Sequence, residues 1–468
     1  MVSLILRFSF LNLTLKLIYK KKVTLMKKHN INNSLNLYKK AEKIIPGKTQ
    51  LISRRSSQFA HGINPIYAKE SKGGYFIDVD DNRYLDWMNA VSAIILGHSH
   101  DYVDNAVKEQ IDKGSIHTVN SALELDLADL LIEQIPSAEM VRYTKGGGDS
   151  CALAVRIARG TTGRDKILFS GYHGWHDWYQ SANYLVNPED GEFPFAGIEP
   201  IGVPKALAGT AIPFIYEDLD NLKSLIKEHG DEVAAIMLEP MRSEFPKEGY
   251  LEEVKKIAHE NGSLLIFDEV SCGWRMSVGG AQKKLGVIPD ITAFAKAMSN
   301  GYPMGAVVGS VEAMEQADRM FVSSSYWSDN IGLSASKATI EYLVKNNSEK
   351  WFEDYGNNLK KKINEVMSSS DVDVKISGIP SGPIIQFMSS ESSEIPLMRT
   401  LFVQEMAKQG IHMSTVFHPT MSHTEKDIDI TVIAIEQSLK TISKAQNSNF
   451  EDYLEAPILN EPFRRLVK

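Results

Sequence analysis

The chain has 468 residues, of which 43% are hydrophobic and 24% charged, and its formal net charge is -8. These values are ordinary for a globular enzyme with two or three domains, or with one large and one smaller domain. The negative charge argues against a general nucleic-acid-binding protein, which would usually be basic. The two cysteines, Cys151 and Cys272, lack metal-ligand spacing. We therefore predict no metal site and no disulfide scaffold, and a cytoplasmic location.

Residues 1–25 are apolar, with scattered Lys and Arg and no acidic residue. The basic residues interrupt the apolar run, which makes it a poor transmembrane helix. It also lacks a small-residue cleavage site, which makes it a poor signal peptide. We interpret residues 1–25 as a mis-assigned start, with translation beginning at Met26, or as an unstructured extension. No membrane partner is predicted.

The following elements are predicted in chain order. A short amphipathic helix runs from Leu37 to just before Pro46, and a hairpin turns at residues 80–82. Strands then alternate with helices between about 90 and 330, which implies a mostly parallel sheet. The predicted strands are 141–144, 166–169, 233–238, 264–267 and 291–295. Helices over 332–345, 351–367, 397–409 and 425–445, with a strand at 384–388, form a compact C-terminal unit.

Two of these strands deliver reactive side chains. The apolar run Leu264–Phe267 leads directly into Asp268, and the run 291–295 leads into Lys296. Open α/β sheets bind ligands at the carboxyl ends of their strands. An amine and a carboxylate at one edge suit chemistry on a pyridine aldehyde, where the amine attaches to the aldehyde and the carboxylate keeps the ring nitrogen protonated. The alternative is a buried structural ion pair.

Two further segments follow predicted strands. Gly146, Gly147 and Gly148 lie between strand 141–144 and a helix predicted from Ser150. This geometry aims backbone N–H groups at an anion, although a glycine run is more often only a flexible turn. Strand 166–169 leads into Tyr172 and His173. These side chains could stack on a ring and assist proton transfer, or could simply be packed loop residues.

The motifs together resemble one family. The chain resembles the class III aminotransferases, fold-type I enzymes that use pyridoxal 5′-phosphate, and among them glutamate-1-semialdehyde 2,1-aminomutase and its aminotransferase-like relatives. The resemblance covers about Leu37 to Ile442. It rests on FDEVSCGWR (267–275), GGAQKKLGVIPDITAFAKAMSNGYPMGAVVG (279–309), ARGTTGRDKILFSGYHG (158–174) and HTEKDIDIT (423–431).

The resemblance implies an α/β fold. A large domain with a mostly parallel sheet would be joined by a smaller α+β domain, formed by the N- and C-terminal parts of the chain. On this basis we predict that residues 91–340 form the cofactor-binding domain. Residues 26–90 and 341–446 would form the small domain, and residues 447–468 a tail.

The resemblance also assigns roles around the cofactor. Lys296 would hold the cofactor covalently and move the substrate proton, and Asp268 would pair with the pyridine nitrogen. Val270 would pack on the ring face opposite Tyr172, which stacks on the ring. His173 belongs to the same cofactor-binding set.

The phosphate group would lie at Gly147 and Gly148, where the family usually has a hydroxyl that this chain lacks. The resemblance implies a homodimer with shared active sites, in which a hydroxyl from one subunit reaches the phosphate of the other. Ser325 is our candidate for that hydroxyl, with Ser328 as the alternative.

The substrate end departs from the aminomutase. Arg54 matches the arginine that holds the substrate carboxylate, but Leu51 stands where the aminomutase has a serine. Glu239, at the end of strand 233–238, is a second candidate for the substrate side. Trp175 and Trp178 add bulk near the cofactor.

These departures favour an aminotransferase that moves an amino group from a small-molecule donor to a carbonyl acceptor, such as a sugar ketone or aldehyde or a semialdehyde. The alternative is glutamate-1-semialdehyde 2,1-aminomutase itself, an isomerase. A third hypothesis is a catalytically silent homologue that only binds the cofactor.

Overall fold

The computed structural model describes residues 29–185, 199–241 and 243–459. The expectation for residues 1–25 therefore lies outside the described residues, as does the end of the predicted tail. Among the described helices, none is long and apolar enough to cross a membrane.

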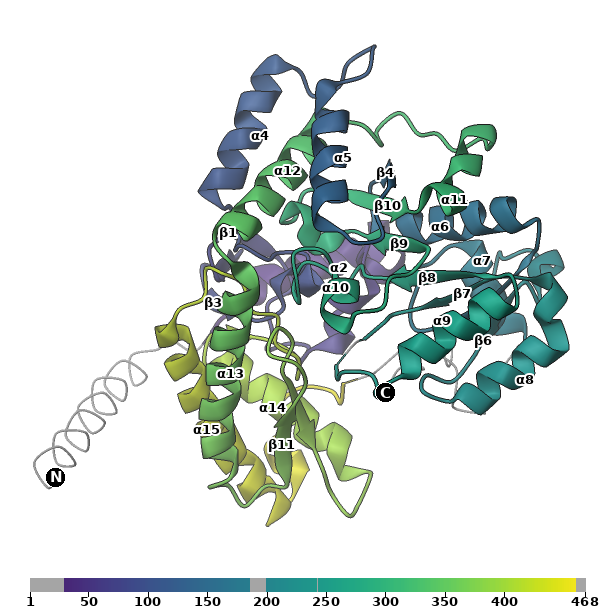
Figure 1. Cartoon of the computed structure of the whole chain (residues 1–468). Helices are drawn as coiled ribbons and strands as arrows, with labels where there is room; N and C mark the ends of the chain where they lie inside the picture. Colours follow the sequence, from purple (N-terminus) through teal and green to yellow (C-terminus); the bar gives the residue numbers. More distant parts are fainter. Residues whose placement is uncertain (1–28, 186–198, 242, 460–468) are drawn as a thin grey trace, which may run out of the picture.

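A seven-stranded sheet forms the centre of the larger part (Figure 1), in the order β4-β10-β9-β8-β7-β5-β6. Strands β5 to β9 run parallel, whereas β10 is antiparallel to both of its neighbours. The prediction of a mostly parallel sheet is confirmed. The strands are β4 (Met140–Thr144), β5 (Lys166–Ser170), β6 (Ala211–Pro213), β7 (Val233–Leu238), β8 (Leu264–Asp268), β9 (Ile291–Phe294) and β10 (Gly305–Gly309).

Helices cover both faces of this sheet because its central strands are apolar on both sides. In β7, Ala235 and Met237 pack with helix α6, whereas Ile236 and Leu238 pack with α8 and α9. A third cluster joins β10 to α4, α5 and α12. These helices are α4 (Asp101–Lys113), α5 (Ala122–Gln134), α6 (Gly147–Thr162), α8 (Leu219–His229), α9 (Tyr250–Glu260) and α12 (Asn330–Lys345).

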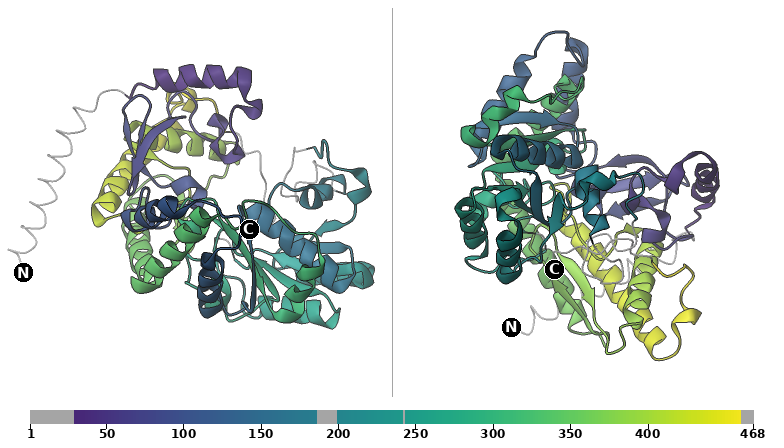
Figure 2. Two further views of the ribbon diagram at one scale, coloured as in Figure 1. Left: turned by 90° about the horizontal axis from the view of Figure 1, so that it is seen from above. Right: turned by 90° about the vertical axis from the view of Figure 1, so that its right-hand side faces the viewer.

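The smaller part is built from both ends of the chain (Figure 2). Its sheet has the order β1-β2-β3-β13, and β13 lies parallel to β3, with Ile411 opposite Leu85. Its strands are β1 (Ala68–Lys72), β2 (Tyr75–Asp78), β3 (Arg83–Asp86), β13 (Ile411–His412) and the separate pair β11 (Val374–Ser377) and β12 (Ile384–Phe387). Its helices are α2 (Asn32–Ile44), α13 (Ser348–Met367), α14 (Glu394–Lys408) and α15 (Glu425–Gln446).

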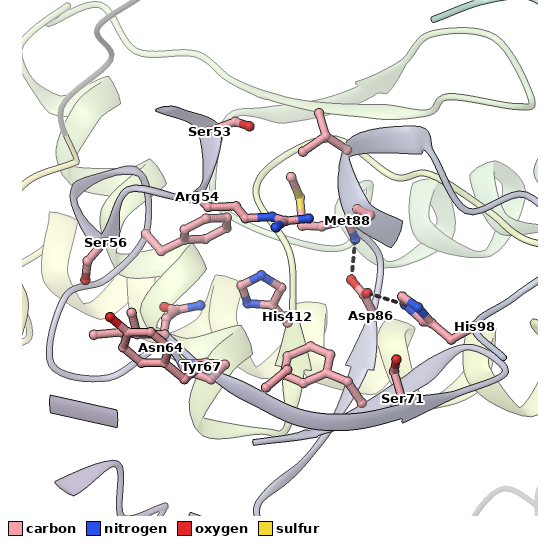
Figure 3. A pocket seen from close by; sticks show the side chains of 17 residues that line it. Ser53, Arg54, Ser56, Asn64, Tyr67, Ser71, Asp86, Met88, His98 and His412 are labelled. Atoms are coloured by element: carbon pink, nitrogen blue, oxygen red, sulfur yellow. Dashed lines mark hydrogen bonds and ion pairs between the residues drawn. The ribbon is translucent and has the colours of Figure 1, made fainter. Parts of the chain in front are cut away.

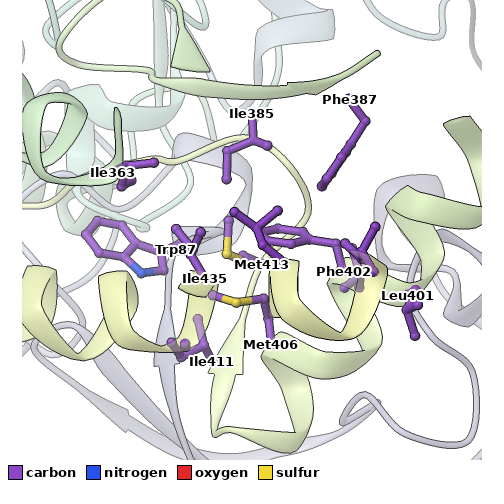
Figure 4. Packing of buried hydrophobic residues seen from close by; sticks show 14 of the residues in the cluster. Trp87, Ile363, Ile385, Phe387, Leu401, Phe402, Met406, Ile411, Met413 and Ile435 are labelled. Atoms are coloured by element: carbon purple, nitrogen blue, oxygen red, sulfur yellow. The ribbon is translucent and has the colours of Figure 1, made fainter. Parts of the chain in front are cut away.

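One hydrophobic core holds the two ends of the chain together (Figure 4). Trp87 packs in the same cluster as Phe402, Met406 and Ile435. The Trp87 Nε1 donates a hydrogen bond of 3.0 Å to Thr431 Oγ1 of α15. The expected α+β unit made from N- and C-terminal parts is therefore present.

Two helices begin earlier than the sequence predicted. Helix α2 begins at Asn32 instead of Leu37, and α6 begins at Gly147 instead of Ser150. Gly146 is extended and caps α6, with its carbonyl accepting a hydrogen bond from the Ser150 N–H. Two of the three glycines therefore belong to the first turn of a helix and not to a loop.

An unusual turn connects the small sheet to the large part. Residues 89–92 are four consecutive non-glycine residues with positive φ angles, at 42°, 52°, 57° and 67°. A left-handed conformation costs an L-residue roughly 1 kcal/mol or more, so the surrounding structure must hold this turn in place. Asp86 Oδ1 accepts from the Asn89 N–H at 3.0 Å, and Arg275 Nη2 donates to the Ser92 carbonyl at 3.0 Å.

Candidate active site

Asp268 and Lys296 lie at the same edge of the large sheet. Asp268 is the last residue of β8 and is in register with Ala293 of the neighbouring parallel strand β9. Lys296 follows the end of β9 by two residues. Both residues therefore lie at the carboxyl ends of adjacent strands, where ligands bind in sheets of this kind.

Lys296 has a left-handed backbone conformation and a buried side chain. Its φ is 49°, and its Nζ donates to Ser271 Oγ at 2.7 Å. Burial lowers the pKa of the Lys296 amine, while the carboxylates of Glu239 and Asp268 act in the opposite direction. A neutral amine is the nucleophilic form, so burial prepares this side chain to attack a carbonyl carbon.

The Asp268 carboxylate is buried, with 3% of the residue exposed. One oxygen, Oδ2, lies 2.8 Å from His173 Nδ1 and accepts from the Cys151 thiol at 3.3 Å. The other, Oδ1, accepts from the Val270 N–H at 3.0 Å. Burial raises the pKa of Cys151, which keeps its thiol protonated and able to donate. Asp268 and Lys296 thus bond to different partners, which argues against the alternative of a structural ion pair.

The start of α6 lies directly against the end of β8. A Cβ added to Gly147 would lie 2.5 Å from Val270 Cγ1, so only glycine fits at this position. At Gly148 a Cβ would lie 3.2 Å from the ring of His176. The structure therefore brings the first N–H groups of a 16-residue helix beside Val270, as a phosphate site requires.

Tyr172 and Glu239 lie together at the ends of β5 and β7. Glu239 is 4% exposed, and its Oε2 accepts from the Tyr172 N–H at 3.1 Å. Gly171 has a φ of 117°, and a Cβ there would lie 2.7 Å from the same Oε2.

The positions of the two tryptophans differ. Trp178 is buried and stacks on His173, whereas Trp175 is 71% exposed and stacks on His176.

The remaining predicted residues lie outside this cluster. Arg54 lines a separate cavity of about 310 Å³ that is lined by neither Lys296 nor Asp268. Ser325 and Ser328 belong to the segment before α12, in which Ser325 is exposed. Ser325 is thus accessible to another subunit but is not brought to the site by its own chain.

Sequence reasoning missed three residues that position the site. Ser271 bonds to Lys296, and the buried Arg275 donates to the carbonyls of Ser92, Ile94 and Pro419. Asn300 Oδ1 accepts from the N–H groups of residues 95 and 96 at 3.0 and 2.9 Å. All three lie in segments that carried the family resemblance, so their place in those segments was the available signal.

The residues present fit pyridoxal 5′-phosphate. The group has an aldehyde, a phosphate and a pyridine nitrogen, which call for an amine, a set of N–H donors and a carboxylate. The cluster offers the buried amine of Lys296, the first turn of α6 and the carboxylate of Asp268. His173 Nε2 and His176 Nδ1 are buried and have no hydrogen-bond partner among the described residues. These unpaired atoms are consistent with a site that a polar group completes.

The fold and this cluster define a pyridoxal-phosphate enzyme of fold-type I. The model of the family "Aminotransferase class-III" matches residues 58–445. A 3-aminobutyryl-CoA aminotransferase of Cloacimonas acidaminovorans is 35% identical over 427 residues, covering 89% of this chain and 99% of the relative. A glutamate-1-semialdehyde 2,1-aminomutase of Syntrophobacter fumaroxidans is 33% identical over 419 residues, covering 85% and 95% of the two chains.

Solved structures agree with the sequence relatives. An omega-transaminase from Sphaerobacter thermophilus has a TM-score of 0.78 and 26% identity, and the match covers 88% of this chain and 98% of that structure. The aminomutase of Pseudomonas aeruginosa PAO1 has a TM-score of 0.75 at 19% identity, covering 88% of this chain and 94% of that structure, and so shares the fold. The chain belongs to the class III aminotransferases, which are pyridoxal-phosphate enzymes.

Proposed function

We propose that this chain is an aminotransferase that uses an external amino donor and a separate carbonyl acceptor. The observation that carries this proposal is the buried amine of Lys296, whose pKa is lowered by burial, at the same sheet edge as Asp268. When bound, pyridoxal 5′-phosphate supplies an aldehyde that carries the amino group and a ring that accepts the electron pair released at the substrate carbon. This arrangement argues against a catalytically silent homologue.

The side chains divide the work as follows. Lys296 takes the proton from the reacting carbon and returns it at the neighbouring position, because burial lowers the pKa of its amine and so favours the form that accepts a proton. Asp268 would face the ring nitrogen, and His173, Cys151 and the Val270 N–H fix its carboxylate in place. Tyr172 and Val270 would hold the ring between them. The N–H groups of Gly147 and Gly148 would bind the phosphate.

The names of the relatives suggest candidate substrates. The relative at 35% identity is named for 3-aminobutyryl-CoA, so a β-amino acyl compound is one candidate for the amino donor, and the corresponding β-keto acyl compound is its candidate acceptor. A sugar carbonyl remains a prediction from the sequence. The aminomutase is the second candidate function, because four relatives with that name are 32–33% identical. Leu51 favours the aminotransferase, since an aliphatic side chain cannot donate to a substrate carboxylate.

The test is a Lys296→Ala variant. We expect it to lose both turnover and the covalent attachment of the cofactor, measured as the mass increase of the protein after borohydride reduction. Retention of normal transamination by Lys296→Ala would disprove the mechanism. A donor and acceptor screen, run beside a direct assay with glutamate-1-semialdehyde, distinguishes the two candidate functions. Release of 5-aminolevulinate without an added acceptor would favour the aminomutase.

We also propose that the enzyme works as a cytoplasmic homodimer with shared active sites. Both cysteines are free and buried, as suits a reducing compartment. Phe321 and Tyr326, on either side of the exposed Ser325, are 85% and 68% exposed. Large apolar side chains exposed together are typical of a protein interface. A partner subunit packed there would bring Ser325 to the phosphate of the neighbouring site.

A further inference from the structure

The first turn of α6 has no side chain of its own that can donate to a phosphate. The glycines at 146–148 offer only backbone N–H groups, and the carboxylate of Asp149 accepts hydrogen bonds. Ser150 is fully buried, and its Oγ lies 3.0 Å from the Phe294 carbonyl oxygen and 2.6 Å from Thr144 Oγ1. A side-chain donor for a phosphate at this turn must therefore come from another segment of the chain.

Residues 174–176 pack directly on Gly148. A Cβ added to Gly174 would lie 2.7 Å from the Gly148 Cα. A Cβ added to Gly148 would lie 3.2 Å from both Cε1 and Nδ1 of His176, and 3.5 Å from Cδ1 of Trp175. The Nδ1 edge of the His176 imidazole therefore borders the space that a side chain of residue 148 would occupy.

The contacts of His176 fix the orientation of its ring. Its Nε2 lies 3.3 Å from Asp149 Oδ1, and the indole of Trp175 stacks on the ring with 4.5 Å between the centroids. Nδ1, on the edge that faces Gly148, is buried and has no hydrogen-bond partner among the described residues. Buried polar nitrogens are usually paired, and a phosphate oxygen would provide a strong partner for this one.

Other candidate donors have different neighbours. His173 Nδ1 lies 2.8 Å from the carboxylate that would face the pyridine nitrogen, and Lys145 is paired with Asp329. Asn64 Nδ2 is also buried and unpaired within the described part of the chain, but it lies at the separate cavity shown in Figure 3. Of these groups, His176 is the one that borders the first turn of α6.

We infer that His176 binds the phosphate of the cofactor, through a hydrogen bond from Nδ1 to a phosphate oxygen, and so replaces the hydroxyl that this chain lacks at its glycine loop. The inference rests on the proposed function and adds a cofactor-binding residue to it. An imidazole with protons on both nitrogens can donate to Asp149 and to the phosphate together. Its positive charge then offsets the negative charge of Asp149 beside the phosphate.

The experiment measures by calorimetry how tightly the full chain, freed of cofactor, binds pyridoxal 5′-phosphate and pyridoxal, which lacks the phosphate. We expect His176→Ala to weaken binding of pyridoxal 5′-phosphate by about tenfold or more, and binding of pyridoxal by less than about twofold. His259→Ala is the matched control and should bind both as wild type does. His259 also pairs with an aspartate, Asp290, at 3.0 Å, and lies on α9, on the opposite face of the sheet from α6.

Two conservative variants separate the nitrogens of the ring. His176→Asn keeps an N–H donor near the position of Nδ1 and should recover part of the lost affinity. His176→Gln extends its amide toward Asp149, where Nε2 lies, and should recover less. If His176 acts only by pairing with Asp149, the order of these two variants is reversed, and the inference is wrong.

A further pair of variants tests whether the histidine takes the place of a hydroxyl. Gly148→Ser alone should weaken binding of pyridoxal 5′-phosphate, because its Cβ would press on the His176 ring. In the His176→Ala background the same serine has room and adds a hydroxyl, so the double variant should bind more tightly than His176→Ala. A double variant that binds more weakly than His176→Ala would show that this space does not face the phosphate.

The comparison of the two ligands decides the inference. If His176→Ala binds pyridoxal 5′-phosphate as tightly as wild type does, or loses affinity for pyridoxal by the same factor, His176 does not bind the phosphate. Calorimetry needs no turnover, so failure of the proposed function, seen as an active Lys296→Ala variant, is a separate result.

Discussion

At the scale of single residues, the amine of Lys296 is balanced between burial and nearby charges. Burial and the charge of Arg275 lower its pKa, and the carboxylates of Glu239 and Asp268 raise it. The protonation of this group is therefore set by identifiable neighbours, each of which can be changed.

Glu239→Gln tests this balance. Removing one negative charge should lower the pKa of the nitrogen at position 296 further, so the pH midpoint of the holoenzyme's cofactor absorbance should move to lower pH. The glutamine oxygen can still accept from the Tyr172 N–H, which limits other changes. Glu248→Gln, at an exposed position, is the control. A midpoint that stays in place or moves to higher pH would contradict this account.

The key residues of the site could be predicted because strand ends have a clear pattern. Asp268 and Lys296 each follow a short apolar run, and the sheet brings such strand ends to one edge. The residues that position the site, such as Arg275 and Ser271, follow no such pattern. Arg275 is a buried guanidinium that bonds to carbonyls distant in sequence, and Ser271 gains its role only through the position of Lys296.

At the scale of elements, the contact between α6 and the end of β8 fixes the proposed phosphate site. The wall of this contact is the side chain of Val270, which lies where a Cβ of residue 147 would be. The first turn of α6 can therefore approach Val270 this closely because residue 147 has no side chain.

A double-mutant cycle measures this contact. Gly147→Ala should destabilise the apo-protein by about 1–3 kcal/mol, because the new methyl group overlaps Val270. Val270→Ala removes both of the nearest methyl groups, so the double variant should lose less stability than the sum of the two single variants. Urea unfolding gives the three values. Simple additivity would show that the close approach of the helix and the strand does not limit this position.

Some elements could not be predicted from their own residues. Gly305–Gly309 is a short apolar run whose composition gives no strand direction, and β10 proved antiparallel within a parallel sheet. The left-handed turn at 89–92 contains no glycine, the usual sign of positive φ, and is held by the distant Arg275. In both cases the deciding contacts come from other parts of the chain.

At the scale of the whole molecule, the proposed shared sites make a prediction about mixed dimers. A hybrid of one Lys296→Ala subunit and one Ser325→Ala subunit has one site with both intact residues and one with neither. We expect this hybrid to recover about half of the wild-type activity per dimer at limiting cofactor. The Lys296→Ala homodimer should be inactive, and the Ser325→Ala homodimer should bind the cofactor weakly.

The hybrid is purified through two different affinity tags, and its cofactor affinity is measured beside its activity. A hybrid that binds cofactor as weakly as Ser325→Ala would place the contributing hydroxyl elsewhere. The same experiment with Ser328→Ala tests the alternative residue. If the chain elutes as a monomer, neither Ser325 nor Ser328 can contribute a hydroxyl to the site of a partner subunit.

The core that joins the two ends of the chain has a consequence for synthesis on the ribosome. Every strand of the seven-stranded sheet lies between residues 140 and 309, so the nascent chain holds all of them well before it is complete. Trp87 is translated early, yet its partners in α14 and α15 emerge almost last. Until then one edge of β3 and an indole have nothing to pack against, and we expect chaperones to engage the first ninety or so residues of the growing polypeptide.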